Sequence, residues 1–304
     1  MKTVIVCGHW ASGKSTAVKE IIGLWGENNV DFRTDRLEFV EGVIEDVEQA
    51  CAEGTLEIIE VEEDAEDEDE GTREIKHIGL KGKYATLLLD PEEAPSAEET
   101  GAFLERIKED QEFKKKVEFW LHDNTVALGA RQRLAREIIE SRDDQSGKFR
   151  LIEMAVSTFT EPDLERDGPM WFSNPFRQTL EDNLKILEDE RVDLKEDVIL
   201  LYIDADFEAR EWRNKNRDDP VNKGVFAAIG KDGGGFDAPG GEALRERLER
   251  ELVEVHVIDN NSNKEEDRER FRREIIEKGE GIRAMLELEC EGVEGGFLYG
   301  ERMR

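Results

Sequence analysis

The chain has 304 residues, of which 75 are acidic and 43 are basic, giving a formal net charge of −32. This charge argues against a broad, sequence-independent grip on DNA or RNA, which requires basic surface. No stretch approaches about eighteen consecutive apolar residues and no basic, hydrophobic leader is found, so we expect a cytoplasmic protein without membrane contact. Three separated cysteines and four scattered histidines predict neither a disulfide framework nor a structural metal.

The acidic residues are spread along the whole chain and are not collected in one tail. This distribution is typical of proteins from a salt-rich cytoplasm, where dissolved ions screen the repulsion between like charges. We therefore expect a halophilic protein whose thermal stability depends on molar KCl.

The first strand is predicted at about Thr3–Cys7, and it runs directly into a phosphate-binding loop. The residues GHWASGKS match the full G-x-x-x-x-G-K-[ST] pattern, and apolar residues follow at helical spacing. In such a loop backbone N–H groups converge on a polyphosphate, Lys14 reaches its β- and γ-phosphates, and Ser15 can hold Mg²⁺. The sequence predicts an ATP site formed by Gly8, Ala11, Ser12, Gly13, Lys14, Ser15 and Thr16.

Further along, strands and helices alternate, which predicts a parallel sheet covered on both faces. A helix is expected from about Arg36 to Ala52 and another over Val126–Ser141. The four remaining core strands are expected near Asn29–Thr34, Phe149–Val156, Val198–Asp204 and Val253–Asp259. We predict a single α/β domain over residues 1–304.

The chain between the second and third core strands is too long for a simple crossover, which predicts an insertion at about 54–122. Alternating residues suggest a hairpin of Leu56–Glu62 and Arg73–Leu80, with a possible third strand at Lys83–Asp90. The acidic block Glu62–Glu70 should be a solvated, mobile tip. Glu98–Leu121 is expected to form one charged helix over the substrate cleft.

Three acidic positions compete for the magnesium ion. Glu153 interrupts an otherwise apolar strand, and an unpaired buried carboxylate is costly, so it is expected to face the phosphate site. Asp90 and Asp204 also follow apolar runs and stay open as alternatives. Asp35 ends the second strand, where a carboxylate could accept a proton from an attacking hydroxyl, orient Mg²⁺, or cap the next helix.

Arg210, Arg213 and Arg217 share one face of a predicted helix after the fourth strand. On so acidic a protein they suggest an anionic partner such as a triphosphate undergoing transfer, although pairing with neighbouring acids within the helix is the alternative. The glycine-rich segment that follows suits a mobile lid at about 210–245.

Together the phosphate loop, the Asp after strand two, the Arg-x-x-Arg helix before a lid, and a last strand ending Val257-Ile258-Asp259-Asn260-Asn261 resemble the P-loop kinases of the adenylate-kinase-like group. The resemblance covers roughly 1–36 and 149–275. It implies a three-layer fold with a parallel sheet of order 2-3-1-4-5 and transfer of the ATP γ-phosphoryl group to a bound acceptor. It also implies that the three arginines are phosphate clamps, that Asn260 and Asn261 lie near the adenine, and that Asp35 faces the acceptor.

Other uses of the loop stay open. A guanine-nucleotide switch is disfavoured, because Asn263-Lys264-Glu265-Glu266 lacks the final Asp of its base-recognition motif. A P-loop ATPase or a nucleotide-gated binding protein without a phosphoryl acceptor remains the main alternative. The acceptor is expected to be a small molecule or a nucleotide, and Arg33 and Arg36 also allow a polynucleotide 5′-end.

Overall fold

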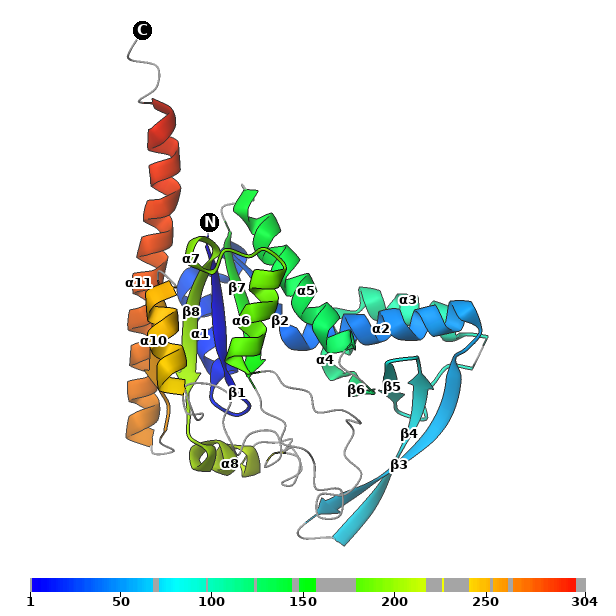
Figure 1. The fold of residues 1–304 in the computed structure, drawn as a ribbon. Coiled ribbons are helices and arrows are strands. Elements are labelled where there is room, and N and C mark those ends of the chain that lie inside the picture. The colour runs from blue at the N-terminus through cyan, green and yellow to red at the C-terminus, as the bar shows by residue number, and fades with distance from the viewer. Residues whose placement is uncertain are drawn as a thin grey trace. The chain divides into compact units, whose positions relative to one another are not determined.

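The computed structural model describes residues 2–67, 71–96, 98–122, 125–143, 148–156, 179–216, 226, 241–251, 254–261 and 265–298 (Figure 1). The chain divides into two compact units: unit 1 contains Met1–Asp35, Leu134–Asp163 and Arg177–Arg304, and unit 2 contains Arg36–Arg133 and Leu164–Phe176. Unit 2 is thus wider than the insertion expected at 54–122. None of the helices in the described part of the chain combines the length and apolar character that crossing a membrane requires.

Unit 1 is built on a five-stranded parallel sheet, which confirms the predicted α/β class. All its strand pairs are parallel, and the strands lie in the order β2-β7-β1-β8-β9. Their bounds are β1 Thr3–His9, β2 Val30–Thr34, β7 Phe149–Val156, β8 Val198–Asp204 and β9 Val255–Asp259.

Numbered along the whole chain, this strand order differs from 2-3-1-4-5, because the four strands of unit 2 come between β2 and β7. Counted over the strands of the parallel sheet alone, β7, β8 and β9 are the third, fourth and fifth strands. The last strand begins at Val255, whereas the sequence predicted a start at Val253, and residues 252–253 lie outside the described residues.

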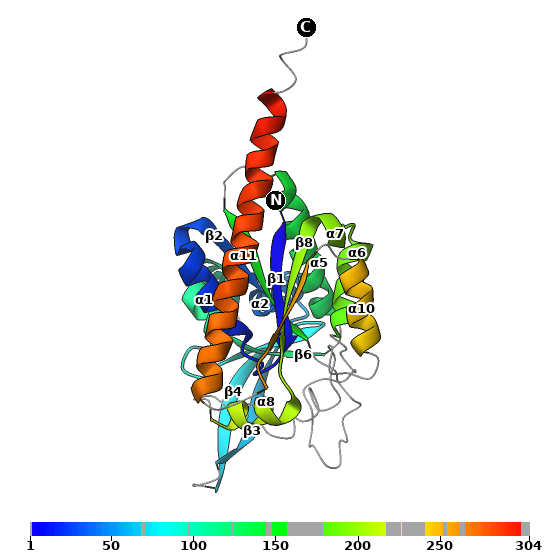
Figure 2. The same cartoon turned by 90° about the vertical axis from the view of Figure 1, so that its left-hand side faces the viewer.

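Helices cover both faces of this sheet because its strands are apolar on both sides. Val4 and Val6 of β1 join an apolar cluster with residues of α1 and α11, whereas Ile5 and Cys7 join a second cluster with residues of α6 and α10. Figure 2 shows α1 and α11 side by side, and the Trp25 Nε1 of α1 donates to the Gly279 carbonyl of α11 at 3.0 Å. The helices of unit 1 are α1 Lys14–Trp25, α6 Leu180–Asp189, α7 Leu194–Asp197, α8 Phe207–Lys215, α10 Gly241–Glu251 and α11 Glu265–Leu298, with short 3-10 turns at Glu27–Asn29 and Ser141–Asp143.

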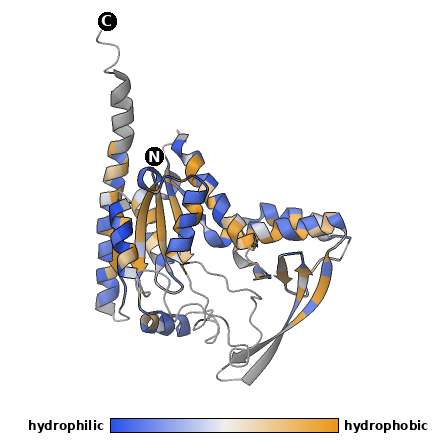
Figure 3. Cartoon of the chain, viewed as in Figure 1, coloured by the Kyte–Doolittle hydropathy of each residue, from blue (hydrophilic) through white to orange (hydrophobic). Residues whose placement is uncertain are grey.

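The hydropathy of the ribbon shows the same layering, since the strands of the parallel sheet are mostly hydrophobic while the helices beside them carry hydrophilic stretches (Figure 3). Cys7 is fully buried within the sheet, as expected of a small apolar residue. Burial raises the pKa of its thiol, so Cys7 stays protonated.

Unit 2 holds a separate antiparallel sheet of order β3-β4-β5-β6, which confirms the predicted hairpin and third strand. In its apolar core, residues of the sheet such as Leu80 and Leu87 pack with residues of the helices such as Phe39, Val43 and Leu104. Its elements are α2 Asp35–Glu53, β3 Glu57–Asp67, β4 Gly71–Lys81, β5 Ala85–Leu89, α3 Thr100–Glu109, α4 Gln111–Lys116, β6 Glu118–Leu121 and the first part of α5 Thr125–Glu140.

Two predictions for unit 2 are wrong. Glu98–Leu121 is not one helix, because Asp110 takes an extended conformation and its carboxylate accepts from the Glu112 and Phe113 amides at 3.0 Å, which starts the new helix α4. Glu118–Leu121 after it then forms β6, which pairs with β5. The acidic block Glu62–Glu70 is not wholly a loop, since β3 runs to Asp67 in register with β4, and residues 68–70 lie outside the described residues.

Candidate phosphate-binding site

The phosphate loop lies between the end of β1 at His9 and the start of α1 at Lys14, and its backbone is in uncommon conformations. Gly13 has φ +106° and Ala11 has φ +57°, both in the left-handed region. A Cβ added at Gly8 would lie 2.5 Å from the Ile203 carbonyl oxygen of the neighbouring strand. The two glycines of the motif are therefore required, one by its φ angle and the other by close packing.

Lys14 is buried at this loop, with 8% of its surface exposed. Its Nζ donates to the His9 carbonyl at 2.7 Å. Burial lowers the pKa of Lys14, while the nearby negative charges of Glu153 and Asp35 raise it. The ammonium group is thus held within electrostatic reach of two carboxylates, one on strand β7 and the other at the start of α2.

Glu153 is opposite Val6 in the pairing of β7 with β1, which brings its carboxylate to the loop. The Ser15 hydroxyl donates to Glu153 Oε1 at 2.9 Å. Burial raises the pKa of Glu153, whereas Lys14 and the Ser15 hydroxyl lower it. Glu153 and Ser15, the two predicted Mg²⁺ ligands, therefore lie in contact.

Of the two alternative magnesium acids, Asp90 belongs to unit 2, where its carboxylate accepts from the Glu92 amide at 2.9 Å in a turn. Asp204 ends β8, and its backbone carbonyl accepts from the Asn260 backbone N–H at 2.7 Å, a bond that does not involve its carboxylate. Within the described residues, no three His, Cys, Asp or Glu side chains group closely enough to hold a metal ion on their own. A hydroxyl and a carboxylate still suit Mg²⁺, which takes most of its ligands from phosphate and water.

Asp35 lies at the same edge of the sheet, at the first position of α2, with 8% of its surface exposed. Its Oδ2 accepts from the Ala155 amide of β7 at 2.5 Å. The contact ties the end of β2 to the end of β7, beside Glu153. Asp35 is thus anchored to the sheet and close enough to Lys14 to influence its pKa.

The arginines of α8 contact backbone carbonyl groups. Arg210 is almost fully buried, and its Nε donates to the carbonyls of Ala205 at 2.9 Å and Asp206 at 3.3 Å. Arg213 Nη1 donates to two loop carbonyls, those of Ser12 at 3.2 Å and Ala11 at 3.3 Å. Arg217, the third predicted arginine, lies outside the described residues, as does most of the predicted lid beyond α8.

The two asparagines after β9 also have backbone partners. The Asn260 Nδ2 donates to the Ser12 carbonyl at 2.6 Å, and only 8% of the residue is exposed. The Asn261 Oδ1 accepts from the Asp206 amide, and this residue is exposed. Support of the loop by Asn260 and Arg213 was missed in the sequence, because the contacts join positions 248 and 201 residues apart.

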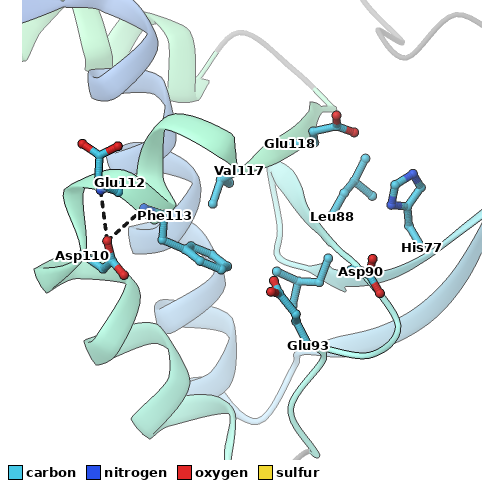
Figure 4. A pocket seen from close by; sticks show the side chains of 10 residues that line it. His77, Leu88, Asp90, Glu93, Asp110, Glu112, Phe113, Val117 and Glu118 are labelled. Atoms are coloured by element: carbon cyan, nitrogen blue, oxygen red, sulfur yellow. Dashed lines mark hydrogen bonds between the residues drawn. The ribbon is translucent and has the colours of Figure 1, made fainter. Parts of the chain in front are cut away.

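An open pocket of about 310 Å³ lies in unit 2 (Figure 4). Its apolar lining residues are Leu88, Leu89, Phe113 and Val117. Figure 4 shows that the Asp110 carboxylate accepts hydrogen bonds from the backbone amides of Glu112 and Phe113, which caps α4. The other polar residues that line it are His77, Asp90, Glu93 and Glu118. This cavity does not contain the groups that phosphate chemistry requires.

Comparison with known proteins adds little to this site. No family model matches the chain, and no curated protein does. A crystal structure of TT1252 from Thermus thermophilus is similar over 94% of this chain and 96% of that one, with 16% identity and a TM-score of 0.36. A likeness this low carries no argument about fold or activity.

Proposed function

We propose that this chain is an ATP-dependent phosphotransferase that moves the γ-phosphoryl group of Mg-ATP to a small-molecule or nucleotide acceptor. The observation that carries the proposal is the meeting of Lys14, Ser15 and Glu153 at the start of α1. Lysine for the phosphates, a hydroxyl and a carboxylate for Mg²⁺, and a helix N-terminus behind them are the parts that phosphoryl transfer uses.

The strand order of the parallel sheet also agrees with the adenylate-kinase-like resemblance when its own five strands are counted.

In the proposed reaction the residues of the chain position the phosphates and neutralise their charge. Lys14 binds the β- and γ-phosphate oxygens through its ammonium group. Ser15 and Glu153 would hold Mg²⁺, which when bound neutralises charge developing on the phosphates. Asp35 is the candidate for accepting the proton of the acceptor hydroxyl. The positive charge of Arg210 adds to that of Lys14, since it contributes to lowering the pKa of that lysine.

The test is ADP release from Mg-ATP in high KCl with a panel of acceptors. The panel holds nucleoside monophosphates, nucleosides, sugars, pantetheine compounds and 5′-hydroxyl oligonucleotides. Acceptor-dependent release supports the phosphotransferase and names its substrate class. Nucleotide binding with slow, acceptor-independent hydrolysis would overturn it in favour of an ATPase or a nucleotide-gated binding protein.

The oligonucleotides test the polynucleotide alternative separately. Of the two arginines that suggested it, Arg36 Nη2 donates to the Val117 carbonyl at 3.0 Å, and Arg33 Nε lies 3.7 Å from Asp31 Oδ1. Both guanidinium groups thus have protein partners. Release with oligonucleotides alone would nevertheless assign the activity to 5′-end phosphorylation.

A further inference from the structure

Two side chains from distant parts of the chain hold consecutive carbonyl groups of the phosphate loop. The Ser12 carbonyl accepts from Asn260 Nδ2 at 2.6 Å and from Arg213 Nη1 at 3.2 Å. The same Arg213 nitrogen reaches the Ala11 carbonyl at 3.3 Å, and its Nη2 donates to the carbonyl of Asn260. Asn260 is itself fixed to the end of β8, because its backbone N–H donates to the Asp204 carbonyl at 2.7 Å.

The direction of these carbonyls sets the direction of the amides that bind phosphate. In a planar trans peptide the C=O and N–H groups point to opposite sides. The Ser12 carbonyl shares its peptide with the Gly13 N–H, so holding the carbonyl toward Asn260 and Arg213 turns that N–H the other way. This is the orientation that an anion-binding loop at a helix N-terminus needs.

The loop needs such support because its backbone is strained. Ala11 at φ +57° is in a conformation that residues with a side chain rarely adopt, and Gly13 at φ +106° is accessible mainly to glycine. A Cβ on Gly13 would lie 2.6 Å from Asn260 Nδ2 and 3.2 Å from the Phe271 ring. The side-chain amide of Asn260 is thus packed directly against the loop.

We propose that Asn260 and Arg213 are positioning residues that hold the phosphate loop in its binding conformation, acting on the polyphosphate through the backbone. This inference rests on the proposed function, since the ligand is the polyphosphate of ATP. It differs from the resemblance, which implied that Asn260 lies near the adenine and that Arg213 clamps the phosphates directly. A loop-holding role affects every polyphosphate equally, whereas a contact to the base affects only nucleotides, so comparing the two ligands decides the role of Asn260. A direct phosphate clamp by Arg213 would also weaken both ligands, but its loss would add independently to that of Asn260, so the double variant decides the role of Arg213.

The experiment compares calorimetric binding of Mg-ATP and of magnesium tripolyphosphate, which has no base, in molar KCl. Asn260→Ala and Arg213→Met should each weaken both ligands by the same factor, about tenfold, the loss expected for a charge-assisted or buried hydrogen bond. Because the two donors share the Ser12 carbonyl, the double variant should lose less than the product of the two single factors.

Matched controls come from the end of α8. Asn216→Ala removes a side chain that is bonded to the Trp212 carbonyl at 2.7 Å, and Lys215→Met removes an exposed charge 3.7 Å from Glu211. Both should bind the two ligands as the wild type does. Asn260→Ser is too short to reach the Ser12 oxygen and provides the same test if the alanine variant does not fold. Arg213→Leu, which also lacks a charge and a donor, does so for the methionine variant.

Three other outcomes would contradict the positioning role. If Asn260→Ala and Arg213→Met weaken ATP but not tripolyphosphate, these residues contact the nucleoside and the positioning role is wrong. Unchanged affinity for both ligands would also overturn it while leaving the proposed function intact. A wild-type protein that binds neither ligand would contradict the proposed function itself, and the positioning role with it.

Discussion

The phosphate loop of unit 1 and the cavity of unit 2 both contain charged residues, but the partners of those residues differ. At the loop, groups of opposite charge from separate elements are buried together, and Lys14 and Glu153 have pKa values moved by that burial. In the cavity, Asp90 and Asp110 accept hydrogen bonds from amides two or three residues along the chain. The loop is therefore the better candidate for chemistry, because buried side chains of opposite charge converge there from separate elements.

The largest effect expected at the loop is that of Lys14→Ala. Removing the ammonium that we propose binds the phosphates should reduce transfer by about a thousandfold or more, while the protein keeps its fold because burying a charged lysine is costly. ADP release and a thermal melt measure the two parts. Lys185→Ala on α6, an exposed lysine, is the control, and full turnover in the Lys14 variant would refute the role of the loop.

Glu153→Gln should lower transfer by about a hundredfold, since it removes the charge of a carboxylate expected to help hold Mg²⁺. Excess Mg²⁺ should restore part of the loss, which a titration of activity against Mg²⁺ would show. A variant with wild-type turnover at all Mg²⁺ concentrations would return Asp204 to consideration as the magnesium acid.

The same variant tests the electrostatics of the loop through pH. Burial raises the pKa of Glu153 above its ordinary value of 4.5, so the folded state binds this proton more tightly than the unfolded state. Its contribution to stability is therefore complete at low pH and is lost as the pH rises from 4.5 through the raised pKa. Urea unfolding over this range should show the wild type losing stability relative to Glu153→Gln, and parallel curves would contradict the burial.

Gly13→Ala tests the strained backbone against a glycine in an ordinary helix. The substitution should cost about 1–2 kcal/mol of stability through its left-handed φ and weaken Mg-ATP binding by about tenfold or more. Gly23→Ala is the matched control, since nothing lies within 4 Å of an added Cβ there. Inside α1 it should add about 0.5–1 kcal/mol of stability and leave binding unchanged. Similar effects of the two variants would show that the left-handed conformation of Gly13 is not required.

The smallest effect belongs to the cavity of unit 2. Asp110→Ala should lower the free energy of unfolding by about 1 kcal/mol through loss of the cap on α4, and Asp110→Asn should retain most of it because asparagine also caps helices. Neither change should alter ATP affinity or turnover. A tenfold loss of turnover in the alanine variant would show instead that the unit 2 cavity takes part in the chemistry.

Sequence patterns predicted the parallel sheet and the elements of the loop because these depend on local signals. The apolar runs of β1, β7 and β8 and the glycines before Lys14 are visible within a few residues. The interrupted stretch at 98–121 was missed because a single cap residue, Asp110, separates two helical segments of similar composition. The extent of β3 was underestimated because repulsion between its acids was expected to outweigh pairing with β4.

The support of the loop was missed for a different reason. Asn260 and Arg213 carry polar groups that suit many tasks, and only the folded chain brings them to Ser12 across more than 200 residues. Of the three acids proposed for Mg²⁺, Glu153 is distinguished by its hydrogen bond with Ser15, which joins positions 138 residues apart. Contacts between residues far apart in the chain produce no periodic pattern in a single sequence, so they could not be predicted from it.

The most direct test of the central claim is calorimetric titration of the wild-type protein with ATP in molar KCl, with Mg²⁺ and with Mg²⁺ removed by a chelator. The loop described here predicts saturable binding at one site, weakened when Mg²⁺ is removed and lost in Lys14→Ala. Absence of binding to the folded wild type, or equal binding by the Lys14 variant, would contradict the assignment of residues 8–16 as the ATP site.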